Sequence, residues 1–367
     1  MRLCFISNPN STHTRRWVTW FARRGHTVCL VADVPLQEPW SEVPIIDLSK
    51  IFYAPIVRFP IWAIWLRRFL HQWRPDILHA HRVNSAGWLA AASGFHPLVI
   101  TPWGTDLYQL PQHSRTIRWL AYYVLRHADL VTADAQDLLQ TASHYGANPG
   151  CLHLVQWGVD ISHFHPGPAK ASLRTEFGLG AGPVILSPRA VNQIYNLDII
   201  IKALPEVMTT LPGAMLILRD YNTDLAYKRR LEELIIKLDL TKAVHWIGRV
   251  DPYERVADIY RLADVVVSVP TSDSTPVSIL EALACGIPVI VSDLPALHEW
   301  LTPGESGLMV SQRDSHELAT ALCQMLTNIE LADRLRRIGP TIIETRANHQ
   351  LEMEKMEELY QTLLDNN

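Results

Sequence analysis

The sequence of 367 residues predicts an α/β protein built from two Rossmann-like domains with parallel sheets. The chain is longer than one hydrophobic core usually supports, so two domains are expected. Short apolar runs alternate with helical patterns from one end to the other, which is typical of parallel sheets covered by helices on both faces. Hydrophobic residues make up 48% and charged residues 19% of the sequence, so there is ample material for two cores.

Twelve apolar runs are expected to form the strands, six in each half of the chain. They are "LCFIS", "TVCLVA", "DILHAH", "LVITPW", "ADLVTA" and "LHLVQW" in the first half, and "PVILSP", "AMLILR", "AVHWIG", "DVVVSV", "PVIVSD" and "GLMVS" in the second. Proline and glycine accumulate at 157–170, directly after the sixth run, which indicates a boundary. We therefore expect an N-terminal domain of residues 1–164 and a C-terminal domain of residues 165–345. A helical stripe of apolar residues follows Asn348, a plausible cap.

The expected location of a ligand follows from this architecture. Ligands of open α/β sheets bind outside the carboxyl ends of the strands. Two such domains facing each other would therefore place the ligand in a central cleft between them.

Charge and cysteine content narrow the class of protein. The formal net charge of -4 gives no electrostatic case for binding nucleic acid, which normally needs a basic domain or stripe. The five cysteines are scattered singly, so we expect them to be reduced. The first apolar run is too short for a signal peptide, and no apolar run reaches the ~18 residues of a membrane span. We therefore expect a cytoplasmic protein.

The segment "RFPIWAIWLRRFLHQWRP", residues 58–75, combines aromatic and basic residues. One interpretation is a core helix with arginines on its exposed face. The other is a surface that contacts a membrane or a lipid-linked acceptor, because Trp and Arg suit the membrane interface. The second interpretation predicts a peripheral location at the inner face of the membrane.

The stretch "SDSTPVSILEALACGIPVIVSD", residues 272–293, places Glu281 inside an otherwise apolar helix. The apolar run before this helix is followed by a Ser/Thr/Pro-rich turn. In that turn, Thr275 or Ser274 is the expected N-cap, and Pro276 is expected at the first helical position. Gly286, followed by a proline, is expected to end the helix. The N-terminus of such a helix has unpaired N–H groups and a partial positive charge, which suit a phosphate.

Two carboxylates of this stretch are candidate ligand groups. Glu281, in the second turn, could accept hydrogen bonds from vicinal hydroxyls such as those of a ribose, and Asp273 could reach a second sugar. The alternative is that Glu281 only binds a neighbouring backbone group or is solvated.

The same stretch closely resembles the signature of retaining GT-B glycosyltransferases in glycosyltransferase family 4, the glycosyl transferases group 1. That signature is an acidic residue, seven intervening positions, a glutamate, and then A-x-A-x-G-x-P-V; here the first acid is Asp273. The segments "VHWIGRV", "ADVVVSVP", "WGVDISHFHP", "ILHAHRVNSAGWLAAASGFHPLVITPWGTDL" and "SNPNSTHTRRWVTWFARRGHTVCLV" also resemble the family in order and spacing. The resemblance therefore spans essentially the whole chain.

The resemblance implies a role for each matching residue. Glu281 would bind the nucleotide ribose, Asp273 the hydroxyls of the donor sugar, and Arg189 the diphosphate. Backbone amides at the start of the helix would meet the diphosphate or the sugar, and they belong to Thr275, Val277 and Ser278. An arginine suits this task because its fork binds phosphate oxygens bidentately and stabilises the leaving diphosphate. The N-terminal domain, with residues 346–367 returning to it as a helix, would bind the acceptor.

The sequence departs from the family at three places. Tyr195 or Asn196 stands where a lysine usually pairs with Arg189, so the charge of the leaving group would fall more heavily on Arg189, the helix dipole and Arg249. Tyr195 is retained among the donor-binding candidates. The usual glycine-rich first loop is replaced by "SNPNSTHT".

The third departure is Trp103, which replaces a histidine beside the reacting sugar. A tryptophan cannot take that proton. Polar candidates near strand ends in the same domain are His79, His81, His13 and Asp106, of which His13 and Asp106 are the stronger.

The resemblance predicts a metal-independent enzyme that moves a sugar from a nucleotide-diphosphate sugar to an acceptor hydroxyl with retention of configuration. No metal motif and no D-x-D are present, so no metal and no cofactor beyond the sugar nucleotide are expected. The acceptor could be a glycan, a lipid-linked intermediate or a small molecule, in polysaccharide or cell-envelope glycan synthesis. Two alternatives stay open: a nucleotide-sugar-binding protein without transfer activity, and a nucleotide-sugar epimerase on the same fold.

Overall fold

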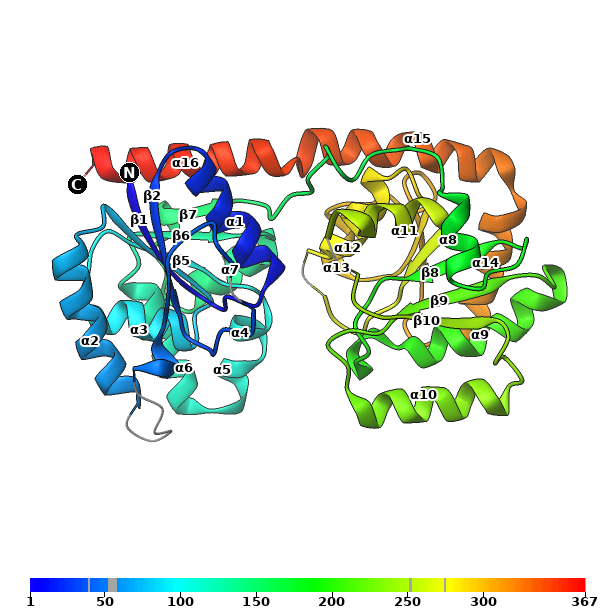
Figure 1. Ribbon diagram of the computed structural model, residues 1–367, viewed down its shortest axis with the longest axis horizontal. Coiled ribbons are helices and arrows are strands. Elements are labelled where there is room, and N and C mark those ends of the chain that lie inside the picture. The colour runs from blue at the N-terminus through cyan, green and yellow to red at the C-terminus, as the bar shows by residue number, and fades with distance from the viewer. Residues whose placement is uncertain (39, 52–57, 251–252, 274, 367) are drawn as a thin grey trace. The chain divides into compact units, whose positions relative to one another are not determined.

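The computed structural model describes residues 1–38, 40–51, 58–250, 253–273 and 275–366. The chain forms two compact units (Figure 1). Unit 1 comprises Met1–Trp157 and Leu351–Asn367, and unit 2 comprises Gly158–Gln350. The chain thus crosses between the units at 157/158 and at 350/351, where the sequence suggested 164/165 and 345/346.

Unit 1 contains a seven-stranded parallel sheet in the order β3-β2-β1-β4-β5-β6-β7. The strands are β1 (Arg2–Ser7), β2 (Thr27–Ala32), β3 (Ile45–Asp47), β4 (Ile77–His81), β5 (Leu98–Thr101), β6 (Leu130–Ala133) and β7 (Leu152–Leu154). The helices are α1 (Thr12–Arg23), α2 (Arg58–Trp73), α3 (Ser85–Ser93), α4 (Thr105–Tyr108), α5 (Leu110–His113), α6 (Arg115–Arg126), α7 (Gln136–His144) and α16 (His349–Asp365), with 3-10 turns η1 (Leu48–Lys50) and η2 (Pro149–Cys151).

Strand side chains of unit 1 alternate between two covered faces, as the period of a strand requires. Cys4, Ile6 and Ile100 lie on the face that α2, α3, α6 and α7 cover. On α2, the residues Trp62 and Leu66 are buried in this core. The interpretation of residues 58–75 as a core helix is therefore confirmed for this buried side.

The opposite face of the unit 1 sheet lies under α1 and α16 (Figure 1). The Phe21 ring of α1 packs against Phe5 of β1 at 6.0 Å and against Tyr360 of α16 at 5.2 Å between ring centroids. The Tyr360 hydroxyl bonds Nδ1 of His79 at 2.5 Å. Glu357 binds both Arg24 and His26. The last helix is therefore an integral layer of unit 1.

Unit 2 contains a six-stranded parallel sheet in the order β10-β9-β8-β11-β12-β13. The strands are β8 (Val184–Ser187), β9 (Met215–Arg219), β10 (Val244–Ile247), β11 (Val265–Ser268), β12 (Val289–Ser292) and β13 (Leu308–Val310). The helices are α8 (Ala171–Glu176), α9 (Leu197–Thr210), α10 (Leu225–Lys237), α11 (Val256–Leu262), α12 (Val277–Ala284), α13 (Pro295–His298), α14 (Ser315–Thr327) and α15 (Ile329–Arg346), with 3-10 turns η3 (Gln193–Tyr195) and η4 (Tyr253–Arg255).

Two cores cover the two faces of the unit 2 sheet. Leu216 and Leu218 of β9 pack with α9, α10 and α14. Ile217, between them, points to the other face and packs with α11 and α12. Figure 1 shows α9 and α10 on one side of this sheet and α11 and α12 on the other. The fold class predicted from the sequence, two Rossmann-like parallel sheets, is confirmed.

All twelve expected strands are present, and among the described residues the structure has one strand that was not expected. The missed strand is β3, three residues long, which pairs with β2 after Pro44. Helix α12 begins one residue later than expected, because Pro276 is its N-cap rather than its first residue. Thr275 is therefore not the cap, and Ser274 lies outside the described residues. Gly286 follows the C-cap with φ of 72°, a left-handed conformation that suits glycine.

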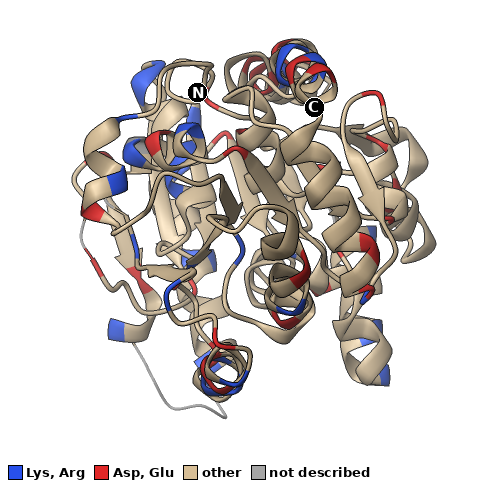
Figure 2. Ribbon diagram, turned by 90° about the vertical axis from the view of Figure 1, so that its right-hand side faces the viewer, with Lys and Arg blue, Asp and Glu red and all other residues tan. Residues whose placement is uncertain are grey.

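The charges of the surface are mixed. In the view of Figure 2, acidic and basic residues are intermingled on several helices. Within the described ranges, no helix is long and apolar enough to cross a membrane.

Candidate functional site

The strand order of unit 2 reverses between β8 and β11, and the candidate site lies where these strands end. In open α/β sheets, such a reversal leaves a crevice outside the carboxyl ends of the strands. The chain that leaves β8 carries Arg189, and the chain that leaves β11 carries Asp273. Two distant segments of the sequence are thereby brought to one point.

Arg189 is held in place from three directions. Its Nη2 lies 2.9 Å from the Asp273 carboxylate, its Nη1 donates to Oγ of Ser278 at 3.2 Å, and its guanidinium lies 4.1 Å from the centre of the Tyr195 ring. The Arg189 side chain is only 9% exposed. Burial by itself would lower the pKa of Arg189, but the charge of Asp273 and the neighbouring tyrosines Tyr195 and Tyr221 raise it above its ordinary value. The cation is therefore fixed in its charged form.

Glu281 lies inside α12 and is 5% exposed. Tyr260 of α11 donates a hydrogen bond to its Oε2 at 3.0 Å, and Tyr253 of η4 donates to its Oε1. A buried carboxylate needs such donors, because leaving it unpaired would be costly. Glu281 is thus buried and its two carboxylate oxygens each accept a hydrogen bond from a tyrosine hydroxyl.

The start of α12 is arranged beside Arg189. The Ser278 side chain accepts the Arg189 hydrogen bond, while the Val277 amide donates to the Thr275 carbonyl at 3.0 Å. Thr275 is buried. Of the amides expected to meet a diphosphate, that of Val277 therefore has an intrachain partner in this structure.

Several residues near the site were not expected from the sequence. Tyr253, Tyr260, Tyr221 and Arg219 come from η4, α11 and the end of β9, far from the signature in the sequence. No local pattern indicated them, because a tyrosine in an apolar helix usually belongs to the core. Arg249, which was expected to assist Arg189, follows the edge strand β10 and is exposed.

In unit 1, the predicted polar candidates lie near the carboxyl ends of β1, β4 and β5. The Asp106 carboxylate accepts backbone N–H bonds from Val83 at 2.7 Å and Trp103 at 2.9 Å. Burial raises the pKa of Asp106. Its oxygens thus bind the two loops after β4 and β5 to each other. His79 likewise has partners on both ring nitrogens, Tyr360 and Thr101.

His13 and His81 belong to an aromatic cluster with Trp17, Trp103 and Trp157. The ring centroids of Trp103 and Trp157 are 5.2 Å apart, and the His13 ring lies 5.2 Å from Trp157. Burial, with a contribution from Arg16, lowers the pKa of His13 to about 4. His13 is therefore neutral near pH 7, which makes it a weak base.

A pocket that the sequence did not indicate lies at the carboxyl end of β2 in unit 1. Asp33 at its base binds Arg82 at 3.0 Å and accepts a hydrogen bond from Ser85 at 2.5 Å. Its apolar wall includes Trp62 and Trp88. Among the residues described, no group of three or more His, Cys, Asp or Glu side chains has the arrangement of a metal site.

Solved structures share this architecture over the full chain. Sucrose-phosphate synthase from Thermosynechococcus elongatus has a TM-score of 0.83 at 20% identity, with 100% of both chains covered. A glycosyltransferase from Rickettsia africae has a TM-score of 0.84 at 16% identity, covering 100% of this chain and 99% of the other. HepE from Anabaena, solved in complex with UDP-glucose, has a TM-score of 0.81 at 19% identity, covering 99% and 100%. The fold is that of the GT-B glycosyltransferases.

Sequence comparisons identify the family. The model "Glycosyl transferases group 1" matches residues 173–341, and the model "Glycosyl transferase 4-like" matches residues 2–135. Together they span most of both units. The chain belongs to the glycosyl transferases group 1, a family of glycosyltransferase enzymes.

Curated relatives carry the name D-inositol 3-phosphate glycosyltransferase. The protein from Nocardia farcinica is 28% identical over 282 residues, which cover 75% of this chain and 58% of the relative. The protein from Rhodococcus erythropolis is 31% identical over 212 residues, which cover 56% of this chain and 47% of the relative. The matched region thus spans about half the length of these relatives.

Proposed function

We propose that this enzyme transfers a sugar from a nucleotide-diphosphate sugar to an acceptor hydroxyl, with retention of configuration and without a metal. The observation that carries the proposal is the convergence of Arg189, Asp273 and Ser278 at the strand reversal of unit 2, with the buried Glu281 in the same helix as Ser278. This set offers one cation for phosphate oxygens and two carboxylates for sugar hydroxyls.

The donor on this proposal is a sugar nucleotide bound by unit 2. HepE, a structural neighbour, was solved with UDP and with UDP-glucose, which makes UDP the first nucleotide to test. Arg189 would bind the diphosphate, Glu281 the ribose and Asp273 the donor sugar. Tyr195 would keep the Arg189 guanidinium oriented through its ring.

The proposed reaction is a displacement on the face of the sugar that the leaving group occupies. The bond between the anomeric carbon and the diphosphate oxygen breaks, and its electron pair stays on the diphosphate. The acceptor oxygen bonds to the anomeric carbon, and its proton passes to the departing diphosphate. The protein then supplies position and charge stabilisation rather than a strong base, which agrees with the low basicity of His13 and the occupied oxygens of Asp106.

The acceptor would be bound by unit 1. The relatives named D-inositol 3-phosphate glycosyltransferase make a phosphorylated polyol one acceptor to test. A glycan or a lipid-linked intermediate of polysaccharide or cell-envelope synthesis is the other class. The pocket at the carboxyl end of β2 combines aromatic walls with the polar side chains of Ser49 and Arg58, which suit a hydroxyl-bearing acceptor.

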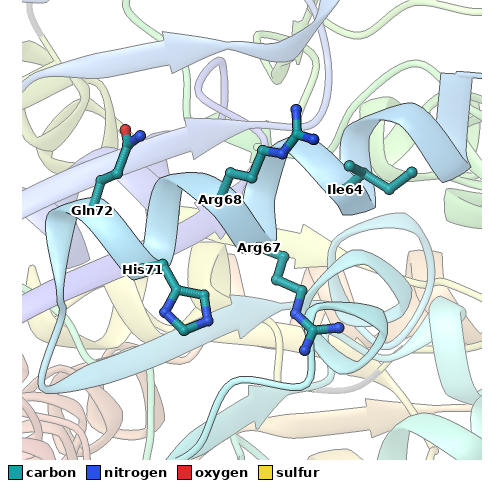
Figure 3. Close-up of a pocket in the computed structure, with 5 residues that line it drawn as sticks. All are labelled: Ile64, Arg67, Arg68, His71 and Gln72. Carbon is teal, nitrogen blue, oxygen red and sulfur yellow. The ribbon is translucent and has the colours of Figure 1, made fainter.

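A peripheral contact with a membrane is part of this proposal. The exposed side of α2 carries Ile64, Arg67, Arg68, His71 and Gln72 around a surface hollow, and Figure 3 shows these side chains pointing away from the helix. The sequence of α2 contains no acidic residue. Helix α6, which packs beside α3 as α2 does, also has no acidic residue and exposes Trp119 by 63%. Basic and aromatic groups of this kind favour an anionic lipid surface.

The test of the proposed transferase function is nucleotide binding measured by calorimetry. We expect one of UDP, GDP and ADP to bind the wild type, and Arg189→Ala and Glu281→Ala to weaken it by roughly 1–3 kcal/mol each. Arg229→Ala, which changes an exposed arginine of α10 in the same unit, serves as the matched control. Failure of all three nucleotides to bind would contradict the proposal.

Measuring the fate of the sugar nucleotide distinguishes the proposed transferase from a binding protein and from an epimerase. Transfer of a labelled sugar to an acceptor supports the transferase. Binding of the sugar nucleotide without transfer or hydrolysis favours a binding protein, and conversion of the donor sugar in the absence of any acceptor favours an epimerase.

A further inference from the structure

Arg219, the last residue of β9, is a buried cation for which the structure provides no acidic partner among the described residues. It is 8% exposed, and its Nε is buried without a hydrogen-bond partner in the described chain. Its one described aromatic contact is with Tyr221, whose ring centre lies 5.4 Å from the guanidinium carbon. A buried charge without a counter-ion is costly, so proteins rarely keep one without a use for it.

The position of Arg219 connects it with the candidate site. Side chains alternate along β9, so Arg219 lies on the same face as Ile217, the face that α11 and α12 cover. Strand β9 is the neighbour of β8, whose following loop carries Arg189. The two arginines thus leave the carboxyl ends of adjacent parallel strands, which is where a ligand of such a sheet binds.

The pKa values of two neighbouring tyrosines agree with the placement of Arg219 beside the candidate site. Burial raises the pKa of Tyr221, and the positive charges of Arg189 and Arg219 both act against that rise. The same two charges act on Tyr260, the residue that donates to Glu281. Arg219 therefore belongs to the same group of charges as Arg189 and Glu281.

We propose that Arg219 is the second cation of the donor site and binds the diphosphate of the sugar nucleotide together with Arg189. This inference rests on the proposed function and adds a residue to it. Tyr195 occupies the position from which a second cation was expected, and Asp273 already neutralises much of the Arg189 charge. When the bond from the anomeric carbon breaks, negative charge grows on the departing diphosphate, and a fixed cation there stabilises it.

An arginine with a purely structural role is expected to donate hydrogen bonds to neighbouring groups of the protein. Arg174, in α8 of the same unit, is a structural arginine: its guanidinium donates to the carbonyls of Gly180 at 2.6 Å and Gly182 at 2.5 Å. No hydrogen bond of this kind links the Arg219 guanidinium to any described residue. Arg174 is therefore the matched control.

The first measurement is the midpoint of thermal unfolding without ligand. We expect Arg219→Gln to unfold at the wild-type temperature or a few degrees above it, because the substitution removes a buried, unpaired charge. Arg174→Gln should unfold at a lower temperature, because it loses hydrogen bonds. A clear loss of stability in Arg219→Gln would indicate a structural arginine and overturn the proposal.

The second measurement is calorimetric binding of the nucleoside diphosphate that the wild type selects, and of the corresponding nucleoside. For Arg219→Gln we expect affinity for the diphosphate to fall roughly 10- to 100-fold, with affinity for the nucleoside unchanged. Arg219→Lys should recover part of the loss, because it restores the charge without the fork. Arg174→Gln should bind both compounds as the wild type does.

The outcomes distinguish this inference from the proposed function. If the wild type binds no nucleoside diphosphate, the proposed function fails. If the wild type binds one and Arg219→Gln binds it equally well, the transferase proposal stands and the role of Arg219 is wrong. An equal loss of affinity for the nucleoside and the diphosphate would also overturn that role.

Discussion

Arg189 and Asp273 form a buried ion pair with 2.9 Å between Nη2 and Oδ2, although the two residues are expected to bind different parts of the same donor. In the absence of a ligand, the diphosphate-binding cation and the sugar-binding carboxylate neutralise each other. An incoming diphosphate must therefore compete with Asp273 for Arg189, and the carboxylate also repels it.

The first prediction concerns Asp273→Asn. Without the carboxylate charge, Arg189 is released to the phosphate, so free nucleoside diphosphate should bind as tightly as in the wild type or more tightly. Turnover of the sugar nucleotide should fall, because an amide accepts hydrogen bonds from the donor sugar more weakly than a carboxylate does. Calorimetry with the diphosphate and steady-state kinetics with the sugar nucleotide measure the two effects. A parallel loss of both would contradict separate roles for the two residues.

The second prediction concerns the tyrosines on Glu281. The ribose hydroxyls would have to share or displace the hydrogen bond that Tyr253 donates to Glu281. Tyr253→Phe should therefore leave nucleotide affinity unchanged or raise it by up to about fivefold, the worth of roughly one hydrogen bond.

Tyr260→Phe is the control for this prediction, because Tyr260 is fully buried in the core. It should lower the free energy of unfolding of unit 2 by about 1–3 kcal/mol, since Glu281 loses a buried donor. Urea unfolding with and without nucleotide measures both variants. Tighter nucleotide binding by Tyr260→Phe than by Tyr253→Phe would reverse the assignment.

The third prediction is that unit 1 is sensitive to acid through His81. This ring is 0% exposed, and neither of its nitrogens has a partner in the described structure. Burial first, then Arg82 and His13, lowers the pKa of His81 from 6.5 to about 3. Below pH 6.5 the His81 ring gains a proton in the unfolded chain but stays neutral in the native state. The contribution of His81 to the free energy of unfolding is therefore fully present above pH 6.5 and is lost as the pH falls towards 3.

His81→Phe should reduce the loss of stability between about pH 7 and about pH 4 by roughly 2–3 kcal/mol. Urea titrations read out by hydrogen exchange of unit 1 peptides provide the measurement. His113→Phe, which changes an exposed histidine of α5, should leave the pH dependence as it is. Equal acid sensitivity in the wild type and His81→Phe would show that another group titrates.

The fourth prediction tests the membrane contact of α2. Arg67→Glu combined with Arg68→Glu should abolish binding to vesicles with an anionic lipid, because each basic residue contributes about 1 kcal/mol near such a surface. Arg229→Glu with Arg230→Glu changes an equally exposed pair on α10 and should bind as the wild type does. Vesicle flotation at low salt measures both. Wild-type protein that floats equally with zwitterionic vesicles, or not at all, contradicts the prediction.

The sequence was sufficient where the signal was local. Continuous apolar runs predicted the long strands of both sheets, and the segment around Glu281 predicted the helix that carries it. The exceptions are informative. The strand β3 was not predicted because three residues after a proline show too little periodicity. Its pairing with β2 stabilises it as a strand.

The partners of the site could not be predicted, because they are set by tertiary packing. Nothing in the sequence near Tyr260 says that its hydroxyl meets Glu281, and nothing near Arg219 says that it lacks an acid. Asp106 illustrates the converse. A carboxylate after a strand suggested a role in the reaction, which stays a prediction, while its two backbone N–H partners in neighbouring loops were not foreseen.

The placement of α16 has a consequence for synthesis of the protein. Unit 1 is interrupted by the whole of unit 2, so the helix that covers Phe21 and His79 is synthesised only after unit 2. Until Tyr360 is synthesised, α1 alone covers this face of the first sheet, and Phe21 and His79 lack the contacts that Tyr360 provides. Unit 1, although its strands are translated before unit 2, can therefore be completed only after unit 2 has been synthesised.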